Sequence, residues 1–108
     1  MPRVDVAETE DKVQVSAELP GIDPENVDVS IAHDVLTISG EKREEREEKK
    51  RDYHRIERSY GSFRRSVPLP TEVDTDKAEA HFKNGLLTIT LPKTEKARAR
   101  KKITVKTG

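Results

Sequence analysis

The chain has 108 residues, of which 31% are hydrophobic and 4% aromatic, so it can build one modest domain whose core is mostly Val, Leu and Ile. Its 21 Lys and Arg residues balance 21 Asp and Glu residues, which leaves no net field that would favour nucleic acid or an anionic membrane. The sequence has no Cys, no apolar run of membrane-spanning length and no signal-peptide pattern, so we expect an intracellular, cytoplasmic protein that gains stability by self-association.

The first forty residues predict two pairs of strands. Pro20-Gly21 and His33-Asp34 are turn signals between strands, and Gly40 is expected to close the second hairpin. Apolar and polar residues alternate in four segments, which predicts strands at residues 4–6, 12–19, 27–31 and 35–39.

Residues 41–52 are all charged, six acidic and six basic. Such a segment has no apolar face with which to join a core, so we expect a mobile loop, either functional or merely solvated. The strand-like segment 53–58 hangs at the end of this loop and can reach beyond its own sheet. Nucleic-acid binding is disfavoured, since acidic residues interleave the basic ones and no aromatic platform accompanies them.

A further strand is expected over residues 61–70, with Phe63, Val67 and Leu69 on one face. The period of two places Arg65 on that apolar side as well. Its guanidinium group must be paired, because an unpaired buried charge costs several kcal/mol, or its stem packs while its head reaches water.

The clearest signal is a hairpin over residues 78–92. The turn residues Asn84-Gly85 supply the positive backbone angles that a tight hairpin needs. Pro92 ends the second strand because proline has no N–H to donate to a ladder. We expect two antiparallel strands, each with one buried face, formed by Ala78, Ala80, Phe82, Leu87, Ile89 and Leu91.

After Pro92 the composition shifts to Lys, Arg and Ala, so we expect a folded domain over residues 1–92 and a C-terminal extension over residues 93–108. About eight short strands with closely spaced turns predict an all-β, immunoglobulin-like antiparallel β-sandwich. There is no nucleophile elbow or glycine-rich phosphate loop, and three scattered His residues lack metal-ligand spacing. We therefore expect neither an enzyme nor a cofactor or metal site.

Five short motifs stand in a fixed order: Leu19-Pro20-Gly21, Leu36-Thr37-Ile38-Ser39-Gly40-Glu41, Glu57-Arg58-Ser59-Tyr60-Gly61-Ser62-Phe63, Leu69-Pro70 and Ala80-His81-Phe82-Lys83-Asn84-Gly85-Leu86-Leu87. Together, over roughly residues 2–105, they resemble the α-crystallin domain of small heat shock proteins of the bacterial and archaeal type. The resemblance implies an ATP-independent holdase chaperone that captures unfolding client proteins and assembles from dimers into larger oligomers. The family normally carries an apolar-rich N-terminal arm, and only Met1-Pro2-Arg3 precedes the first strand here, so we expect that an arm has been removed.

The resemblance also implies where this chain meets other copies. The loop-borne strand would be exchanged with a partner and would pair beside the partner's first strand, with Arg65 near the contact. The residues expected at this dimer interface are Val4, Val6, Tyr53, His54, Ile56 and Arg65. A histidine at this contact would make assembly sensitive to mild acid, because its side chain gains a charge there. His54→Gln tests this idea through the pH profile of dimerisation.

The pair Ile103 and Val105 sits where the family has its C-terminal anchor, although it can also be read as a frayed apolar pair in a disordered tail. Two side chains at i and i+2 project the same way and can fill adjacent pockets. The groove that receives the anchor, or a client, is expected at Val27, Val29, Ile31, Ala78, Ala80 and Phe82.

One other class of function stays open from the sequence. A related sandwich of the co-chaperone kind, with a p23-like fold, would dock one folded partner and would not capture unfolded chains. The tethered strand at residues 53–58 favours the chaperone, because a monomeric docking module has no use for an exchangeable strand.

Overall fold

The computed structural model describes residues 2–50, 53–100 and 103–108, with residues 42–50 and 53–60 described by their backbone. Short helical turns η1 (Pro24–Asn26), η2 (Thr75–Lys77) and α1 (Glu95–Arg98) lie between or after the strands. The strands are β1 (Val4–Glu8), β2 (Lys12–Glu18), β3 (Val27–Ala32), β4 (Val35–Lys50), β5 (Tyr53–Pro68), β6 (Glu79–Lys83) and β7 (Leu86–Pro92).

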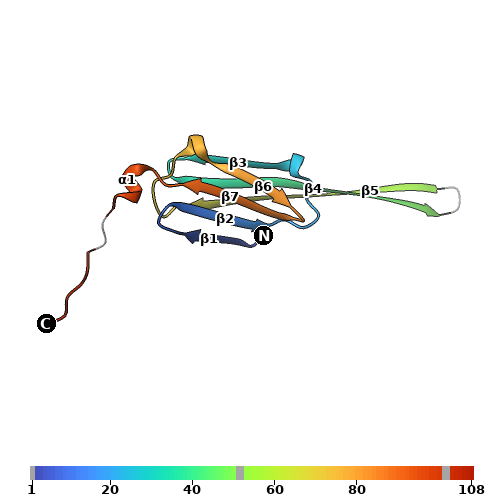
Figure 1. Cartoon of the computed structure of the whole chain (residues 1–108). Coiled ribbons are helices and arrows are strands. Elements are labelled where there is room, and N and C mark those ends of the chain that lie inside the picture. The colour runs from blue at the N-terminus through green and yellow to red at the C-terminus, as the bar shows by residue number, and fades with distance from the viewer. Residues whose placement is uncertain (1, 51–52, 101–102) are drawn as a thin grey trace.

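The strands form two antiparallel sheets that pack face to face (Figure 1). One sheet has four strands in the order β1-β2-β7-β6, and the other has three in the order β3-β4-β5. Every pairing is antiparallel. This arrangement confirms the all-β antiparallel sandwich expected from the alternating pattern.

The core lies between the two sheets and is built from aliphatic side chains. In β2 and β7 every second residue is buried, as the alternation predicts, while the residues between them are at least partly exposed. The buried apolar residues are Val13, Val15, Ala17, Leu19, Leu36, Ile38, Val67, Val73, Leu87, Ile89 and Leu91.

Two tight turns set the register of the hairpins on which the core depends. His33 and Asp34 have φ angles of 52° and 60°, and Asn84 and Gly85 have φ angles of 52° and 78°. Two consecutive residues with positive φ form the type of turn whose twist matches that of antiparallel strands. Both turns confirm the positions expected from the sequence.

The fully charged segment is strand rather than the loop that we expected. β4 does not stop at Gly40 but runs to Lys50, and β5 returns beside it; residues 51 and 52 lie outside the described residues. Figure 1 shows these strands as an arm that projects beyond the sandwich. Residues 41–50 are all charged, and opposite charges at directly paired positions favour a two-stranded ribbon. Such positions are Glu45↔Arg58, Arg46↔Glu57 and Glu48↔Arg55.

The long β5 also changes the strand count. The segments expected as separate strands at residues 53–58 and 61–70 belong to one continuous strand, so the described residues form seven strands instead of about eight. At the C-terminus, β7 ends at Pro92 as predicted, and α1 forms one helical turn shortly after. Residues 103–108 then extend away from the sandwich, at the end opposite the arm (Figure 1).

Candidate functional site

An open groove of about 300 Å³ lies between the edge strands of the two sheets. One wall is β3, the edge of the three-stranded sheet, and the other is β6, the edge of the four-stranded sheet. The small side chains of Ala78 and Ala80 leave the gap unfilled. The lining residues are Val29, Ser30, Ile31, Thr75, Ala78, Glu79, Ala80 and Ile89.

The structure brings four of the six expected groove residues to this pocket, namely Val29, Ile31, Ala78 and Ala80. The other two, Val27 and Phe82, are half-buried and pack against the core. The expectation that β6 has one buried face is wrong, since Ala80 is exposed. The reason is that no strand of the described chain covers this side of the sandwich, so the inward side of an edge strand faces the groove.

The expected anchor residues lie outside the groove of their own chain. The exposed fractions of Ile103 and Val105 are 91% and 86%, and both belong to the extended C-terminal segment. Leaving a large aliphatic side chain in water costs roughly 1.5 to 3 kcal/mol relative to full burial. The described chain therefore holds both an apolar hollow and an unburied apolar pair.

The two remaining sheet edges are β1 and β5, each of which has one neighbouring strand within the described chain. On β1, Val4 is half-buried and Val6 is 44% exposed. The backbone of residues 53–58 pairs with β4 of its own chain and leaves its other edge open. The side chains of Tyr53, His54 and Ile56 lie outside the described residues, and the strand is not paired with β1 of its own chain.

Arg65 lies on the inward side of β5, as the sequence predicts. It is half-buried between Phe63 and Val67, while its neighbours Arg64 and Ser66 are exposed. The Nε atom of Arg65 is buried and has no hydrogen-bond acceptor in the described part of the chain. A buried donor without an acceptor costs about 1 to 3 kcal/mol, so this group favours a further contact.

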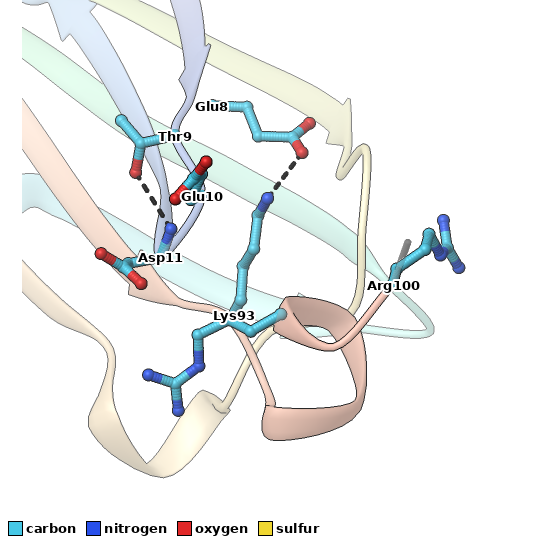
Figure 2. Close-up of a pocket in the computed structure, with 7 residues that line it drawn as sticks. Glu8, Thr9, Glu10, Asp11, Lys93 and Arg100 are labelled. Atoms are coloured by element: carbon cyan, nitrogen blue, oxygen red, sulfur yellow. Dashed lines mark hydrogen bonds and ion pairs between the residues drawn. The ribbon is translucent and has the colours of Figure 1, made fainter. Parts of the chain in front are cut away.

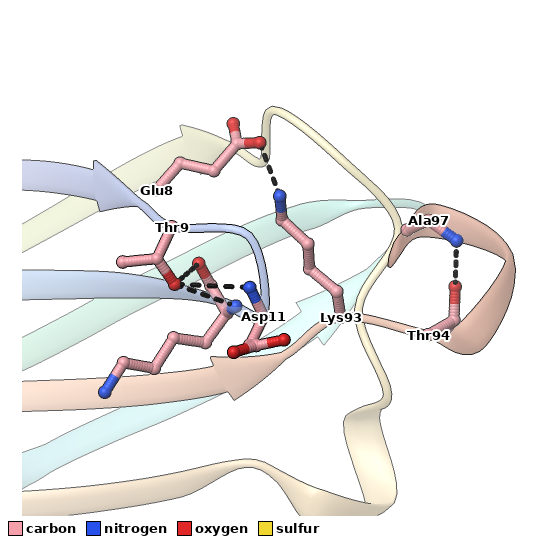
Figure 3. A network of polar contacts seen from close by, with 7 residues as sticks. Glu8, Thr9, Asp11, Lys93, Thr94 and Ala97 are labelled. Carbon is pink, nitrogen blue, oxygen red and sulfur yellow. Dashed lines mark hydrogen bonds and ion pairs between the residues drawn. The ribbon is translucent and has the colours of Figure 1, made fainter. Parts of the chain in front are cut away.

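One ion pair was missed by the reading of the sequence. Nζ of Lys93 donates a hydrogen bond to Oε2 of Glu8 at 2.7 Å, and the Lys93 side chain is 9% exposed (Figure 3). The backbone N–H of Lys93 also donates to the carbonyl of Asp11 at 2.8 Å, and Lys93 forms a β-bridge with Val73. The first residue of the C-terminal extension, Lys93, is thus bonded to the last residue of β1, Glu8.

This ion pair lies beside a wide, open cavity of about 950 Å³ with a charged lining (Figure 2). The lining residues are Glu8, Thr9, Glu10, Asp11, Lys93, Arg98 and Arg100. Thr9 shapes the turn there, since its Oγ1 accepts hydrogen bonds from the N–H groups of Asp11 and Lys12 at 3.3 and 3.2 Å. None of these lining residues is a large apolar residue, so the cavity does not offer the apolar surface that the groove offers to an aliphatic side chain.

The described residues contain no group of three or more His, Cys, Asp or Glu placed to hold a metal ion. No helix in the described part of the chain has the length and apolar character that crossing a membrane requires. The candidate binding site is therefore the apolar groove, together with the two open strand edges.

The sequence profile of the Hsp20/alpha crystallin family matches residues 5–106 of this chain. Small heat shock protein C2 of Rickettsia felis is 46% identical over 101 residues, which cover 94% of this chain and 66% of that protein. Heat shock protein 16 of Schizosaccharomyces pombe is 45% identical over 107 residues, which cover 97% of this chain and 75% of that protein. The chain spans 66% and 61% of the length of two Rickettsia felis relatives.

Solved structures agree with the sequence comparison. Heat shock protein 16.0 from Schizosaccharomyces pombe matches with a TM-score of 0.76 and 46% identity, over 97% of both chains. A small heat-shock protein from Xylella fastidiosa matches with a TM-score of 0.67 and 34% identity, over 100% of this chain and 96% of that chain. The chain belongs to the Hsp20/alpha crystallin family.

Proposed function

We propose that this chain is an ATP-independent holdase chaperone, which binds unfolding proteins and keeps them from aggregating. The observation that carries the proposal is the open apolar groove between β3 and β6, in a member of the Hsp20/alpha crystallin family. The function involves binding and release alone, and no bond is made or broken. A cytoplasmic location stays a prediction from the sequence.

Client capture follows from the chemistry of the groove. An unfolding protein exposes extended segments with alternating aliphatic side chains, and these fit a hollow lined by Val29, Ile31 and Ala80. Burial of each client side chain contributes on the order of 1.5 to 3 kcal/mol before ordering costs. Such weak contacts exchange readily, so a client that is released can refold.

The same groove has a second proposed occupant, the C-terminal anchor of another copy. Ile103 and Val105 are two residues apart and almost fully exposed, which suits insertion of both side chains into one extended hollow. Their burial contributes on the order of 3 to 5 kcal/mol before ordering costs. Clients and tails then compete for the groove, and assembly protects it when no client is present.

The basic unit of assembly is proposed to be a dimer that exchanges strands. The segment 53–58 on the projecting arm would pair with β1 of the partner near Val4 and Val6, because both strands have an open edge within the described chain. An acceptor on the partner would satisfy the buried Nε of Arg65. The solved small heat-shock protein from Xylella fastidiosa has a distinct high order structure, which supports assembly beyond the single chain.

The chaperone function is tested by light scattering from a heat-labile client enzyme, warmed with and without the chain in the absence of ATP. We expect suppression at near-stoichiometric amounts. Ala80→Gln fills the groove with a polar side chain and should raise the amount needed several-fold. His81→Gln places the same residue at an exposed neighbouring position outside the groove and is the matched control.

Three outcomes separate the alternatives. Suppression that Ala80→Gln weakens and His81→Gln leaves unchanged supports a holdase that acts through the groove. Suppression that neither variant changes overturns the role of the groove. Absence of suppression, together with a monomeric mass in solution, supports a module that docks one folded partner.

A further inference from the structure

The zero net charge of the chain hides a strong separation of charge along it. Residues 96–108 contain six Lys and Arg residues and no Asp or Glu. The remaining 15 basic residues stand against all 21 acidic residues in residues 1–95. The C-terminal segment therefore carries a formal charge of +6, and the rest of the chain carries −6.

Much of the negative charge lies in the two segments that form the groove. Residues 23–34, which include β3, contain four acidic residues and no Lys or Arg. Residues 72–80, which lead through η2 into β6, contain four acidic residues and one basic residue, Lys77. That lysine is already close to Asp74, with 3.9 Å between Nζ and Oδ2. The two segments that supply the groove walls are thus acidic in sequence, although Glu25 and Asp28 line a different hollow, and the groove lining itself is mostly apolar.

One carboxylate belongs to the groove itself. Glu79 is the single charged residue among the eight that line it, and its side chain is 73% exposed. Within the described residues its side-chain neighbour is the imidazole of His81, whose Nε2 lies 3.7 Å from Oε2 of Glu79. Because Glu79 alternates with Ala80 along β6, its exposed carboxylate lies at the rim of the groove, where it remains accessible to a cation.

We infer that the groove selects its occupant by charge: it prefers an extended aliphatic pair with basic neighbours, as in the C-terminal segment of a second copy, and rejects acidic neighbours. This inference rests on the proposed docking of Ile103 and Val105. In an extended segment these two residues face the groove, and Lys102 and Lys106 occupy the alternate positions, toward its rim. Attraction between exposed charges reaches about 8 to 10 Å at physiological salt, so it acts at the rim.

The consequence is that the groove discriminates between C-terminal segments by the charge beside their anchor residues. A single exposed ion pair contributes little, but several basic residues that approach a chain body of net charge −6 raise the rate of encounter and disfavour like-charged competitors. Copies of this chain then assemble with one another in preference to relatives whose anchors have acidic neighbours. High salt weakens that preference because it screens both the attraction and the repulsion.

The test uses fluorescent peptides of residues 99–108 and fluorescence anisotropy. The receptor is the full chain with Ile103→Gly and Val105→Gly, so that its own tail cannot fill the groove. At low salt we expect the native peptide to bind about 10-fold more tightly than a peptide with Lys101, Lys102 and Lys106 changed to Glu. At high salt this ratio should fall to less than about 3-fold.

The receptor variant Glu79→Gln locates the effect. It should weaken the native peptide about 3-fold, since one exposed charge pair is lost. It should leave a peptide with Arg100, Lys101, Lys102 and Lys106 all changed to Gln unaffected. Equal weakening of both peptides would overturn the role of Glu79 as a charge-selecting residue.

A third peptide separates failure of this inference from failure of the proposed function. It keeps all basic residues but has Ile103→Gly and Val105→Gly. If it binds as tightly as the native peptide, the aliphatic anchor is wrong. If it fails to bind while the Glu-flanked peptide binds like the native one, the anchor stands and the charge selection is overturned.

Discussion

Lys93 and Glu8, which are 85 residues apart in the chain, form a hydrogen-bonded ion pair at 2.7 Å. The ammonium end is largely buried, with a side-chain exposure of 9%, whereas the carboxylate side is 42% exposed. The pair joins the end of β1 to the first residue after β7 (Figure 3). Both proposed assembly elements, the edge strand and the C-terminal extension, therefore meet at one contact.

The two partners of this pair differ in burial, so their replacements should differ in cost. Glu8→Ala leaves a buried ammonium group without a partner and should lower the free energy of unfolding by about 1 to 2 kcal/mol. Lys93→Met removes the charge and keeps the apolar stem, so its cost should stay below about 1 kcal/mol. Urea unfolding at one fixed protein concentration measures both. An equal or reversed order would show that the charge on Lys93 is not effectively buried.

Gly40 and Phe63 are paired in the register of β4 and β5, and the aromatic ring covers the glycine. A Cβ atom at residue 40 would lie 2.7 Å from Cε1 of Phe63 and 3.0 Å from the carbonyl oxygen of Asn26. Gly40→Ala should therefore cost about 1 to 3 kcal/mol, because the ring must move. The measurement is the urea midpoint of unfolding.

Gly61 provides the matched control for that substitution. It lies in β5, and a Cβ atom there would meet nothing within 4 Å. Gly61→Ala should be neutral or slightly stabilising, since it also reduces the freedom of the unfolded chain. Equal destabilisation by both variants would mean that the cost at Gly40 is not steric.

The sequence predicted those parts of the fold that depend on local patterns. Period-two alternation identified β2 and β7, and the pairs His33-Asp34 and Asn84-Gly85 identified the turns. The charged arm was not predicted, because a segment without apolar residues gives no signal that separates a loop from a solvated ribbon. The ion pair of Lys93 was not predicted either, since nothing in a basic run indicates a partner 85 residues away.

The candidate groove was predicted in part. The alternating apolar residues of β3 and β6 were identified, because each strand carries its own pattern. These two strands flank one groove because of how the two sheets stack. The pattern of a single strand does not predict that stacking. The position of Glu79 at this hollow follows from the same stacking, so its contribution emerged from the structure alone.

Arg65 offers a test of the proposed dimer. If an acceptor from the partner satisfies its buried Nε, Arg65→Ala should weaken dimerisation by about 2 to 4 kcal/mol, because that acceptor loses a charged donor. Analytical ultracentrifugation over a range of concentrations measures the dissociation constant. Arg64→Ala, at the exposed neighbouring position, should dimerise like the parent. A dimer equally strong in both variants would place Arg65 outside the contact.

The proposed anchor predicts a specific change of mass in solution. Ile103→Gly combined with Val105→Gly removes both aliphatic side chains, so any assembly larger than a dimer should dissociate to dimers. The dimer itself should persist, since its proposed contacts lie on β1 and the arm. Thr104→Gly alters the polar residue between them and should leave the mass unchanged. Light scattering coupled to size-exclusion chromatography measures the mass, and large assemblies that survive the double substitution would be held by a different contact.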